Sequence, residues 1–318
     1  MIYAPIIIPT LNRAEHLRRC ITSLQANLWA KYTELIISVD FPPSQKYFDG
    51  YRAVCGYLQS GVEGFASVEI IYQETNLGAY QNMQFLLDYS MKKCDRYIFL
   101  EDDNEFSPNF IEFIDKGLEI FEHDEDIMAI CAVGSALKGN ESYNVVRSQN
   151  FAAYGYGMWH AKRIEMYRML NNGFYEELAR NKDKLLQLIR TNVGLLFSLQ
   201  AIIFDKEKTY RLEDGQIPVI DQMIKMYLIT EYKYVIGACV NKARNWGLDG
   251  SGENCKKDTR YNPRKITFDQ NDRFDYQYTN PMGMHKLKNE FTLRIRCQVL
   301  VALVKLWVWK LRGGRIGV

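Results

Sequence analysis

The sequence lacks the patterns of structural metal and disulfide sites. Its seven cysteines form no C-x-x-C pair, and its four histidines show no zinc-ligand spacing. An odd number of cysteines without such pairs is typical of free thiols in a reducing compartment, so we expect a cytosolic protein. The opening segment, 3–9, is too short and too uncharged for a signal peptide, which favours the same location.

The motifs of several enzyme classes are absent as well. No G-x-G-x-x-G follows the first apolar run, so a dinucleotide-binding unit is not expected, and the lack of G-x-x-x-x-G-K-[ST] excludes a P-loop. There is no G-x-S-x-G motif either. The 318 residues contain no internal repeat or low-complexity linker, and 47% of them are hydrophobic. This composition predicts one continuous folded chain.

An excess of one charge is also missing from the chain as a whole. Lys and Arg number 40 and Asp and Glu 38, which gives a net charge of +2. No general affinity for polyanions follows, and we expect no nucleic-acid partner. The basic residues are unevenly distributed, however, because residues 286–318 contain eight of them and one acidic residue.

What the chain does contain is an alternation of apolar runs and helical patterns. Strands are predicted at 6–8, 35–39, 68–72 and 97–100, and helices from a cap at Asn12 to Leu28 and at 80–91. The later pattern is less regular, with strands expected at 128–133 and 234–240 and helices at 164–170, 176–190 and 222–228. Apolar strands alternating with helices are typical of an α/β fold, with a mostly parallel sheet covered on both faces.

Three adjacent carboxylates, Glu101, Asp102 and Asp103, follow the predicted strand at 97–100. They repel one another, and their burial is costly without a cation. Carboxylate oxygens suit Mg²⁺ or Mn²⁺, and such an ion could neutralise a diphosphate leaving group. The alternative is a solvated acidic turn before a helix that begins near Ser107-Pro108.

Polar residues follow the other predicted strands: Thr10, Arg13, Asp40, Asn76 and Gly78. Ligands bind at the carboxyl ends of parallel strands, so these positions together predict a nucleotide site. A guanidinium at a helix start can meet a phosphate, and a carboxylate can hold a base or a ribose hydroxyl. Taken singly, each residue is equally explained as part of a helix start or a turn.

Asp221 is a candidate general base, because two apolar residues precede it and its carboxylate could accept a proton from an acceptor hydroxyl. From the residues alone, an N-cap before the helical pattern at 222–228 is the simpler explanation. Glu213 and Asp214, in the same polar stretch, are alternative bases.

Together these motifs resemble the GT-A glycosyltransferases, family 2 and its relatives. The resemblance rests on Ile6-Ile7-Ile8-Pro9-Thr10-x-Asn12-Arg13, Asp40, Asn76-x-Gly78 and Glu101-Asp102-Asp103. The acidic segment, continued by Glu105, Pro108 and Phe110, is also similar to the metal-binding stretch of N-acetylglucosaminyltransferase I. Segments 154–159 and 245–252 resemble the WGWATW and NIGFDGSG segments of a bacterial branch.

The resemblance implies a GT-A (Rossmann-like) fold, a UDP-sugar donor and a divalent metal, Mn²⁺ or Mg²⁺. It implies that Asp103 binds the metal and that Asp221 is the base. Asn254 stands where the branch has a histidine, so that role is either vacant or passes to His285. The residues expected to bind or border the donor are Thr10, Arg13, Asp40, Asn76, Gly78, Glu101 and Asp102.

We therefore expect an inverting hexosyl- or N-acetylhexosaminyltransferase that acts on a glycan or lipid-linked glycan in bacterial surface polysaccharide synthesis. Residues 1–126 would form the nucleotide-sugar-binding half, 127–285 the acceptor-binding half and 286–318 a basic tail. One alternative is a sugar-nucleotide pyrophosphorylase, which would need a G-x-G-T-R loop after the first strand. The other is a non-catalytic carbohydrate-binding or scaffold protein on the same fold.

The tail predicts a C-terminal amphipathic helix. Its almost wholly apolar segment, 298–309, is 12 residues long and spans about 18 Å as a helix, short of the roughly 30 Å of a membrane core. Basic residues bracket it and tryptophans lie near its end, which suits an anionic membrane surface. We expect a cytoplasmic enzyme, peripheral at the inner face of the cell membrane. The alternative is a helix packed on the domain or in a dimer.

Overall fold

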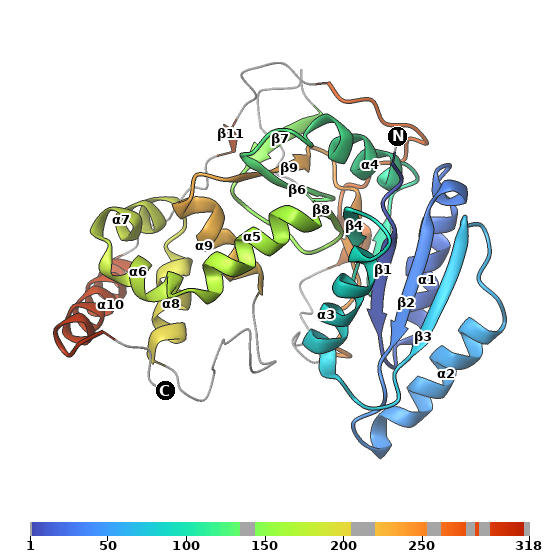
Figure 1. Cartoon of the computed structure of the whole chain (residues 1–318), viewed down its shortest axis with the longest axis horizontal. Coiled ribbons are helices and arrows are strands. Elements are labelled where there is room, and N and C mark those ends of the chain that lie inside the picture. Colours follow the sequence, from blue (N-terminus) through green and yellow to red (C-terminus); the bar gives the residue numbers. More distant parts are fainter. Residues whose placement is uncertain are drawn as a thin grey trace.

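The computed structural model describes residues 2–133, 144–204, 220–252, 262–277, 284–285 and 293–314. Within them lies a nine-stranded sheet with the order β11-β7-β9-β6-β8-β4-β1-β2-β3 (Figure 1). Its strands are β1 (Ile6–Thr10), β2 (Glu34–Val39), β3 (Ser67–Tyr72), β4 (Arg96–Phe99), β6 (Ile127–Cys131), β7 (Val145–Ser148), β8 (Tyr156–Trp159), β9 (Tyr234–Ala238) and β11 (Met284–His285). A separate ribbon pairs β5 (Asn104–Phe106) with β10 (Ala243–Asn245).

Ten α-helices are described: α1 (Ala14–Gln25), α2 (Phe48–Gln59), α3 (Gly78–Met91), α4 (Phe110–Ile120), α5 (His160–Asn171), α6 (Phe174–Arg180), α7 (Lys182–Thr191), α8 (Gly194–Phe204), α9 (Ile220–Thr230) and α10 (Leu293–Leu311). Figure 1 shows α1 and α2 beside β1–β3, while α6, α7, α8 and α10 gather at the opposite end of the molecule. None of the helices in the described ranges is both long and apolar enough to cross a bilayer.

The sheet is mostly parallel, as its apolar strands predict. Strand β1 pairs in parallel with β2 and β4, β2 with β3, β6 with β9, and β11 with β7, while β8 runs antiparallel between β4 and β6 and β7 runs antiparallel to β9. Strands before and after residue 126 therefore share one hydrogen-bonded sheet. The expected α/β class is confirmed.

Each apolar strand serves two hydrophobic cores, because successive side chains of a strand point to opposite faces. In β1, Ile7 packs into the core that contains residues of α3 and α5–α9, whereas Ile6 and Ile8 pack into the core that contains residues of α1, α2 and α4. All three are fully buried. A strand covered on both sides cannot alternate with polar residues, which explains the continuous apolar runs.

Two local predictions are wrong. The first helix begins at Ala14 rather than after a cap at Asn12. Arg13, which precedes Ala14, makes no side-chain capping hydrogen bond, and the helix ends at Gln25. Leu28 therefore lies beyond the helix and is half exposed. The predicted helix at 176–190 is two helices, because Asn181 leaves the helical conformation and its side chain accepts hydrogen bonds from the first turn of α7.

Gly157 provides a test of the packing between β8 and α4. A Cβ on Gly157 would lie 2.3 Å from Cγ2 of Ile114, so strand or helix must shift. We expect Gly157→Ala to lower the free energy of unfolding by about 1–3 kcal/mol, as in overpacked cores. Equilibrium denaturant unfolding measures the change.

The matched control is Gly56→Ala, in the exposed part of α2, where a Cβ meets no atom within 4 Å. It should raise the free energy of unfolding by about 0.4–1 kcal/mol, because alanine restricts the unfolded chain and suits a helix. Two changes of the same sign and size would contradict the packing of α4 on β8.

Candidate active site

The carboxyl ends of the parallel strands meet at one edge of the sheet, where most predicted site residues lie. Thr10 ends β1, and its Oγ1 donates a hydrogen bond of 2.7 Å to Oδ2 of Asp102. The backbone N–H of Asp40, just after β2, donates to the carbonyl of Thr10 at 2.9 Å. Three strand ends that are distant in sequence are therefore in direct contact.

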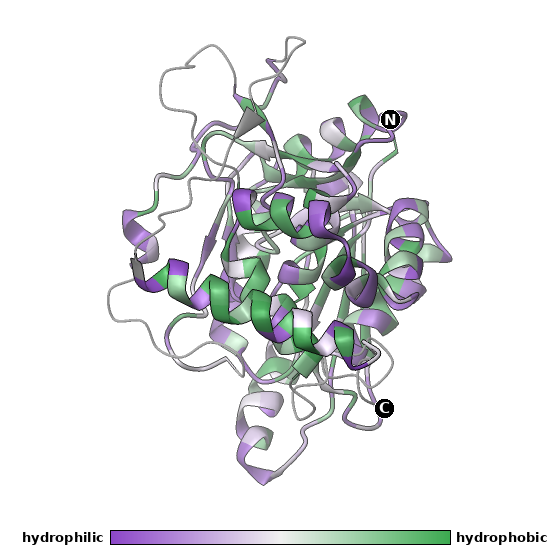
Figure 2. Ribbon diagram, turned by 90° about the vertical axis from the view of Figure 1, so that its left-hand side faces the viewer, coloured by the Kyte–Doolittle hydropathy of each residue, from purple (hydrophilic) through white to green (hydrophobic). Residues whose placement is uncertain are grey.

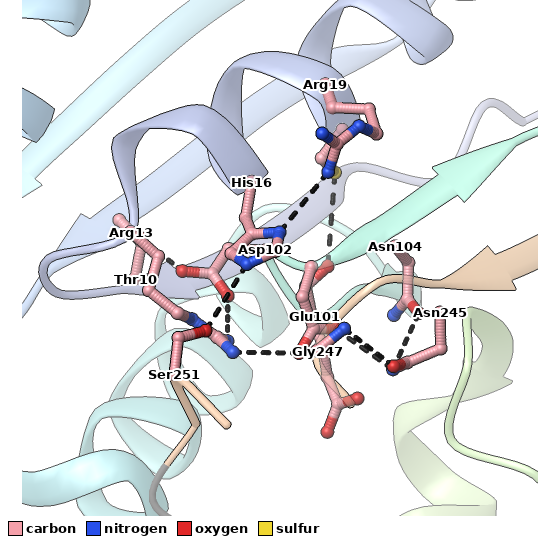
Figure 3. A network of polar contacts seen from close by, with 12 residues as sticks. Thr10, Arg13, His16, Arg19, Glu101, Asp102, Asn104, Asn245, Gly247 and Ser251 are labelled. Carbon is pink, nitrogen blue, oxygen red and sulfur yellow. Dashed lines mark hydrogen bonds and ion pairs between the residues drawn. The ribbon is translucent and has the colours of Figure 1, made fainter. Parts of the chain in front are cut away.

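Arg13 contacts both aspartates of the acidic triplet, and Figure 3 shows it beside Asp102. Its Nη1 contacts Oδ2 of Asp103 at 2.9 Å, and its Nη2 contacts Oδ1 of Asp102. Burial lowers the pKa of the guanidinium, but the two carboxylates outweigh burial and raise the pKa of Arg13 above its usual value. Burial also raises the pKa of Asp103, and Arg13 opposes that rise. The arginine thus neutralises part of a crowded acidic site.

A glycine-rich loop, residues 245–252, covers the same aspartates. Asn245 ends β10, which pairs with β5, and its Nδ2 donates to Oδ1 of Asp103 at 3.1 Å and to Oδ1 of Asn104 at 3.2 Å. The backbone N–H of Trp246 donates to the carbonyl of Asp103 at 2.8 Å. A Cβ on Gly247 would lie only 2.0 Å from Oδ2 of Asp103, so only glycine fits this approach.

Side chains of α1 hold this loop in place. Nε2 of His16 lies 3.0 Å from Oδ2 of Asp249. It also lies 3.3 Å from Oγ of Ser251 (Figure 3). The guanidinium of Arg19 stacks 4.1 Å from the ring centroid of Trp246, and the indole N–H of Trp246 donates to Glu105 at 2.9 Å. The loop is therefore fastened at both ends, on the strand after the acidic triplet and on the first helix.

Glu101 and Asp221 add two further carboxyl groups. Burial first, and then the charges of Asp103 and Asp221, together raise the pKa of Glu101 to about 8. Asp221 lies in the first turn of α9, and burial raises the pKa of its carboxyl, while Lys225 and the N–H groups of Ala153 and of Asp221 itself lower it. Asp221 is thus the second residue of α9 rather than a cap before it, and its charge acts on Glu101 of the acidic triplet.

Asp40, Asn76 and Gly78 form a second group of contacts. The carboxylate of Asp40 accepts hydrogen bonds from the backbone N–H groups of Leu77 and Gly78, both at 2.8 Å, and from that of Phe41 at 2.9 Å. The Nδ2 of Asn76 donates to it at 3.1 Å. Burial raises the pKa of Asp40 and these N–H groups lower it. Asp40 thereby anchors the start of α3.

The structure thus brings most predicted residues together, while others fall elsewhere. His285 lies on β11, five strands from β4, and at about 4.8 Å per strand this is roughly 24 Å from the triplet. Glu213, Asp214 and Asn254 lie outside the described residues. The sequence patterns did not predict that His16, Asn245 and Gly247 belong to the site. Asn245 and Gly247 could have been predicted, because they lie in the glycine-rich segment 245–252 that resembles a segment of the family.

The donor set fits an ion of the Mg²⁺ type. No group of three or more His, Cys, Asp or Glu side chains placed to hold a metal occurs in the part of the chain that the structure describes. Such ions, however, need only one or two protein carboxylates, with substrate phosphates and water as the other ligands. In the part of the chain that the structure describes, Asp102 and Asp103 share the guanidinium of Arg13, and Glu101 lies close enough to Asp103 for their charges to interact. A bound cation would offset charge in this group.

Comparisons with known proteins extend these observations. A family model described as "Glycosyl transferase family 2" matches residues 6–198. Among solved structures, S. aureus TarS is 12% identical with a TM-score of 0.39, over 74% of this chain and 36% of TarS. Mouse xyloside xylosyltransferase 1 in its apo form is 13% identical with a TM-score of 0.32, over 52% of this chain and 71% of that one. No curated protein matches.

The family match spans β1 to β4, with the polar ends that meet at the site, and continues to α8. It covers more than half of the chain, and the central sheet has the mixed α/β arrangement expected for the GT-A fold. The similarity of the acidic segment to N-acetylglucosaminyltransferase I stays a prediction. The predicted family and fold are confirmed: this chain belongs to glycosyl transferase family 2.

Proposed function

We propose that this protein is an inverting glycosyltransferase that moves a hexose or N-acetylhexosamine from a UDP-sugar to a hydroxyl of a glycan or lipid-linked glycan. Bacterial surface polysaccharide synthesis is the setting we infer. The observation that carries the proposal is the contact of Thr10 and Arg13 with Asp102 and Asp103 at the carboxyl ends of the strands, in a chain whose family transfers glycosyl groups.

The nucleotide would lie along the strand ends. Thr10, Asp40, Asn76 and Gly78 belong to neighbouring strand ends and the start of α3, where backbone N–H groups can meet a base or a ribose. Asp40 already accepts hydrogen bonds from this segment, so its role would be to shape the nucleotide pocket as well as to line it. Arg13 would contact the diphosphate, since a guanidinium binds phosphate oxygens in a bidentate manner.

Asp103, with Glu101 beside it, would hold Mn²⁺ or Mg²⁺. When bound, the ion would neutralise charge on the departing UDP. Asp103 contacts Arg13 and Asn245 through separate oxygens, and the guanidinium would turn from the carboxylate toward the diphosphate as the donor binds. Asp102, bound to Thr10, would stay in place beside the ribose or donor sugar.

Asp221 would act as the base. The bond between the anomeric carbon and the diphosphate oxygen breaks, a bond from the acceptor oxygen to that carbon forms, and the hydroxyl proton passes to Asp221. The raised pKa of Asp221 supports this role, because a carboxylate with a higher pKa is a stronger proton acceptor. Its charge is also close enough to Glu101 to influence that group.

The metal assignment predicts that UDP stabilises the protein far more with Mn²⁺ than with a chelator. Ligand at 100 times its Kd raises the free energy of unfolding by about 2.7 kcal/mol, which is several degrees in Tm. In Asp103→Ala, the shift in Tm caused by UDP should be the same with Mn²⁺ as with chelator. Thermal unfolding of each variant with and without UDP measures this shift. Asp49→Ala, at a fully exposed carboxylate of α2, is the control. Equal stabilisation of wild type and Asp103→Ala would refute the metal role.

The base assignment predicts that Asp221→Asn keeps UDP affinity and loses turnover by about 10²- to 10⁴-fold, as general-base losses do. Turnover is read as UDP release from a panel of UDP-sugars with Mn²⁺ and glycan acceptors. Asp183→Asn makes the same change in the first turn of α7 and should leave the rate unchanged. Near-normal turnover of Asp221→Asn would show that Asp221 is not the base and has only a structural role in the first turn of α9. Binding of UDP-sugars by wild type without any turnover would favour the non-catalytic alternative.

The loop contact predicts a large effect from a single methyl group. Gly247→Ala places a carbon against the carboxylate of Asp103, so the loop must move away from the triplet. We expect the affinity for UDP in the presence of Mn²⁺ to fall at least tenfold. The free energy of unfolding without ligand should change by about 1–3 kcal/mol at most. Gly56→Ala is again the control for an alanine at a glycine position. Unchanged affinity would show that the loop is not part of the site.

A further inference from the structure

Helix α10 packs on the protein through one face only. Ala302, Leu306 and Trp309 are buried on that face, in the same core as residues of α8. The guanidinium of Arg180 lies 5.4 Å from the ring centroid of Trp309, and Nζ of Lys310 donates to the carbonyl of Arg180 at 3.3 Å. The helix therefore has a fixed orientation on the domain, and its two faces can be assigned.

The opposite face is apolar and exposed. Leu300, Val304, Trp307 and Leu311 recur at spacings of four, three and four residues, which places them in one stripe along the helix. Their exposed fractions are 64%, 50%, 61% and 66%, and neighbouring Val301 is 53% exposed. Figure 2 looks onto this end of the molecule and shows α10 in front, with green and purple turns alternating along it. A contiguous exposed patch of this kind marks an interaction surface.

Basic residues line both edges of this stripe. At 100° per residue, Arg294, Lys305 and Arg312 fall on one side of it, and Arg296 and Lys310 fall on the other. All five are exposed, and α10 contains no acidic residue. The stripe is therefore bordered by positive charge along both of its edges.

We propose that the exposed face of α10 binds an anionic lipid surface, with the helix lying parallel to it. The exposed apolar side chains would enter the headgroup boundary, and the five flanking cations would contact anionic headgroups on both sides. The helix would not insert across the bilayer, because its opposite face is buried against the protein. This inference rests on the surface of α10 and does not depend on the proposed sugar transfer.

Charge decides between a lipid surface and a second copy of this chain. Two copies joined through this stripe would bring ten cations together with no acidic residue on either helix to pair with them. Anionic lipid offers opposite charge along both edges. The surface is therefore complementary to a membrane and repels its own copy.

The test is flotation of the full chain with vesicles. Wild type should bind vesicles of phosphatidylcholine with about 30% phosphatidylglycerol at low ionic strength, because anionic headgroups attract the basic residues of α10. It should bind pure phosphatidylcholine at least tenfold more weakly. Added salt should release the protein from the anionic vesicles, because salt screens this attraction. Leu300→Ser with Trp307→Ser should abolish binding. Leu28→Ser with Ile120→Ser, at similarly exposed positions elsewhere, should not.

The charged edge is tested separately. Lys305→Gln with Arg312→Gln should weaken binding by about 25-fold at low salt, roughly fivefold per cation. Arg18→Gln with Arg52→Gln removes two exposed cations from α1 and α2 and should change binding less than twofold.

Three outcomes would overturn the proposal. The first is an absence of vesicle binding by wild type, and the second is equal binding by wild type and the stripe variant. The third is a dimer in sedimentation velocity that becomes monomeric in the stripe variant, which would assign the face to a second copy. Substitutions at exposed positions are preferred to deletion of α10, because deletion would uncover the core beneath it. Unchanged thermal unfolding of each variant confirms that the fold is retained.

Discussion

The bridge from Arg13 to Asp102 and Asp103 is the interaction on which the site depends. Adjacent carboxylates at the end of a buried strand cannot remain ionised without donors or a cation, and removing one partner of a buried ion pair costs about 3–5 kcal/mol. Arg13 supplies one positive charge for two aspartates. Burial, reinforced by the charges of Asp103 and Asp221, raises the pKa of Glu101, and Arg13 opposes that rise. Two aspartates thus share one guanidinium, and a bound cation would offset the remaining charge.

The other contacts around the triplet are neutral donors, and their positions follow from the same constraint. Thr10 and Asn245 satisfy carboxylate oxygens without adding charge, and Gly247 lets a backbone approach where any side chain would collide. A further fixed cation here would satisfy the carboxylates permanently and compete with a metal. Neutral donors instead hold the geometry without adding charge, which suits the reversible binding of a cation and a diphosphate that we propose.

The sequence predicted the strands and the polar strand ends well, because fully buried parallel strands and their ends have local signatures. It could not predict contacts between distant residues. Asn245 meets Asp103 across 142 positions, a separation that no local pattern encodes. Asp40, Asn76 and Gly78 were each expected to contact a nucleotide, and the structure shows that the side chain of Asn76 and the N–H of Gly78 donate hydrogen bonds to the carboxylate of Asp40. The predicted start of the first helix after Asn12 and the predicted continuous helix at 176–190 were wrong for a simpler reason. Several polar residues near these positions have similar capping propensity, so the sequence does not fix where a helix begins.

Helix α10 has one face that is buried on the domain and an opposite face that is apolar and exposed. Apolar residues all round a helix predict burial, whereas a basic and apolar helix predicts a membrane surface. A helix has a circumference wide enough for both. Trp309 is buried beside Arg180, while Trp307, two positions earlier, lies on the opposite side and is exposed. Both tryptophans lie at the end of one apolar segment, and the packing of α10 against α8 distinguishes the tryptophan that holds the helix from the one that is exposed.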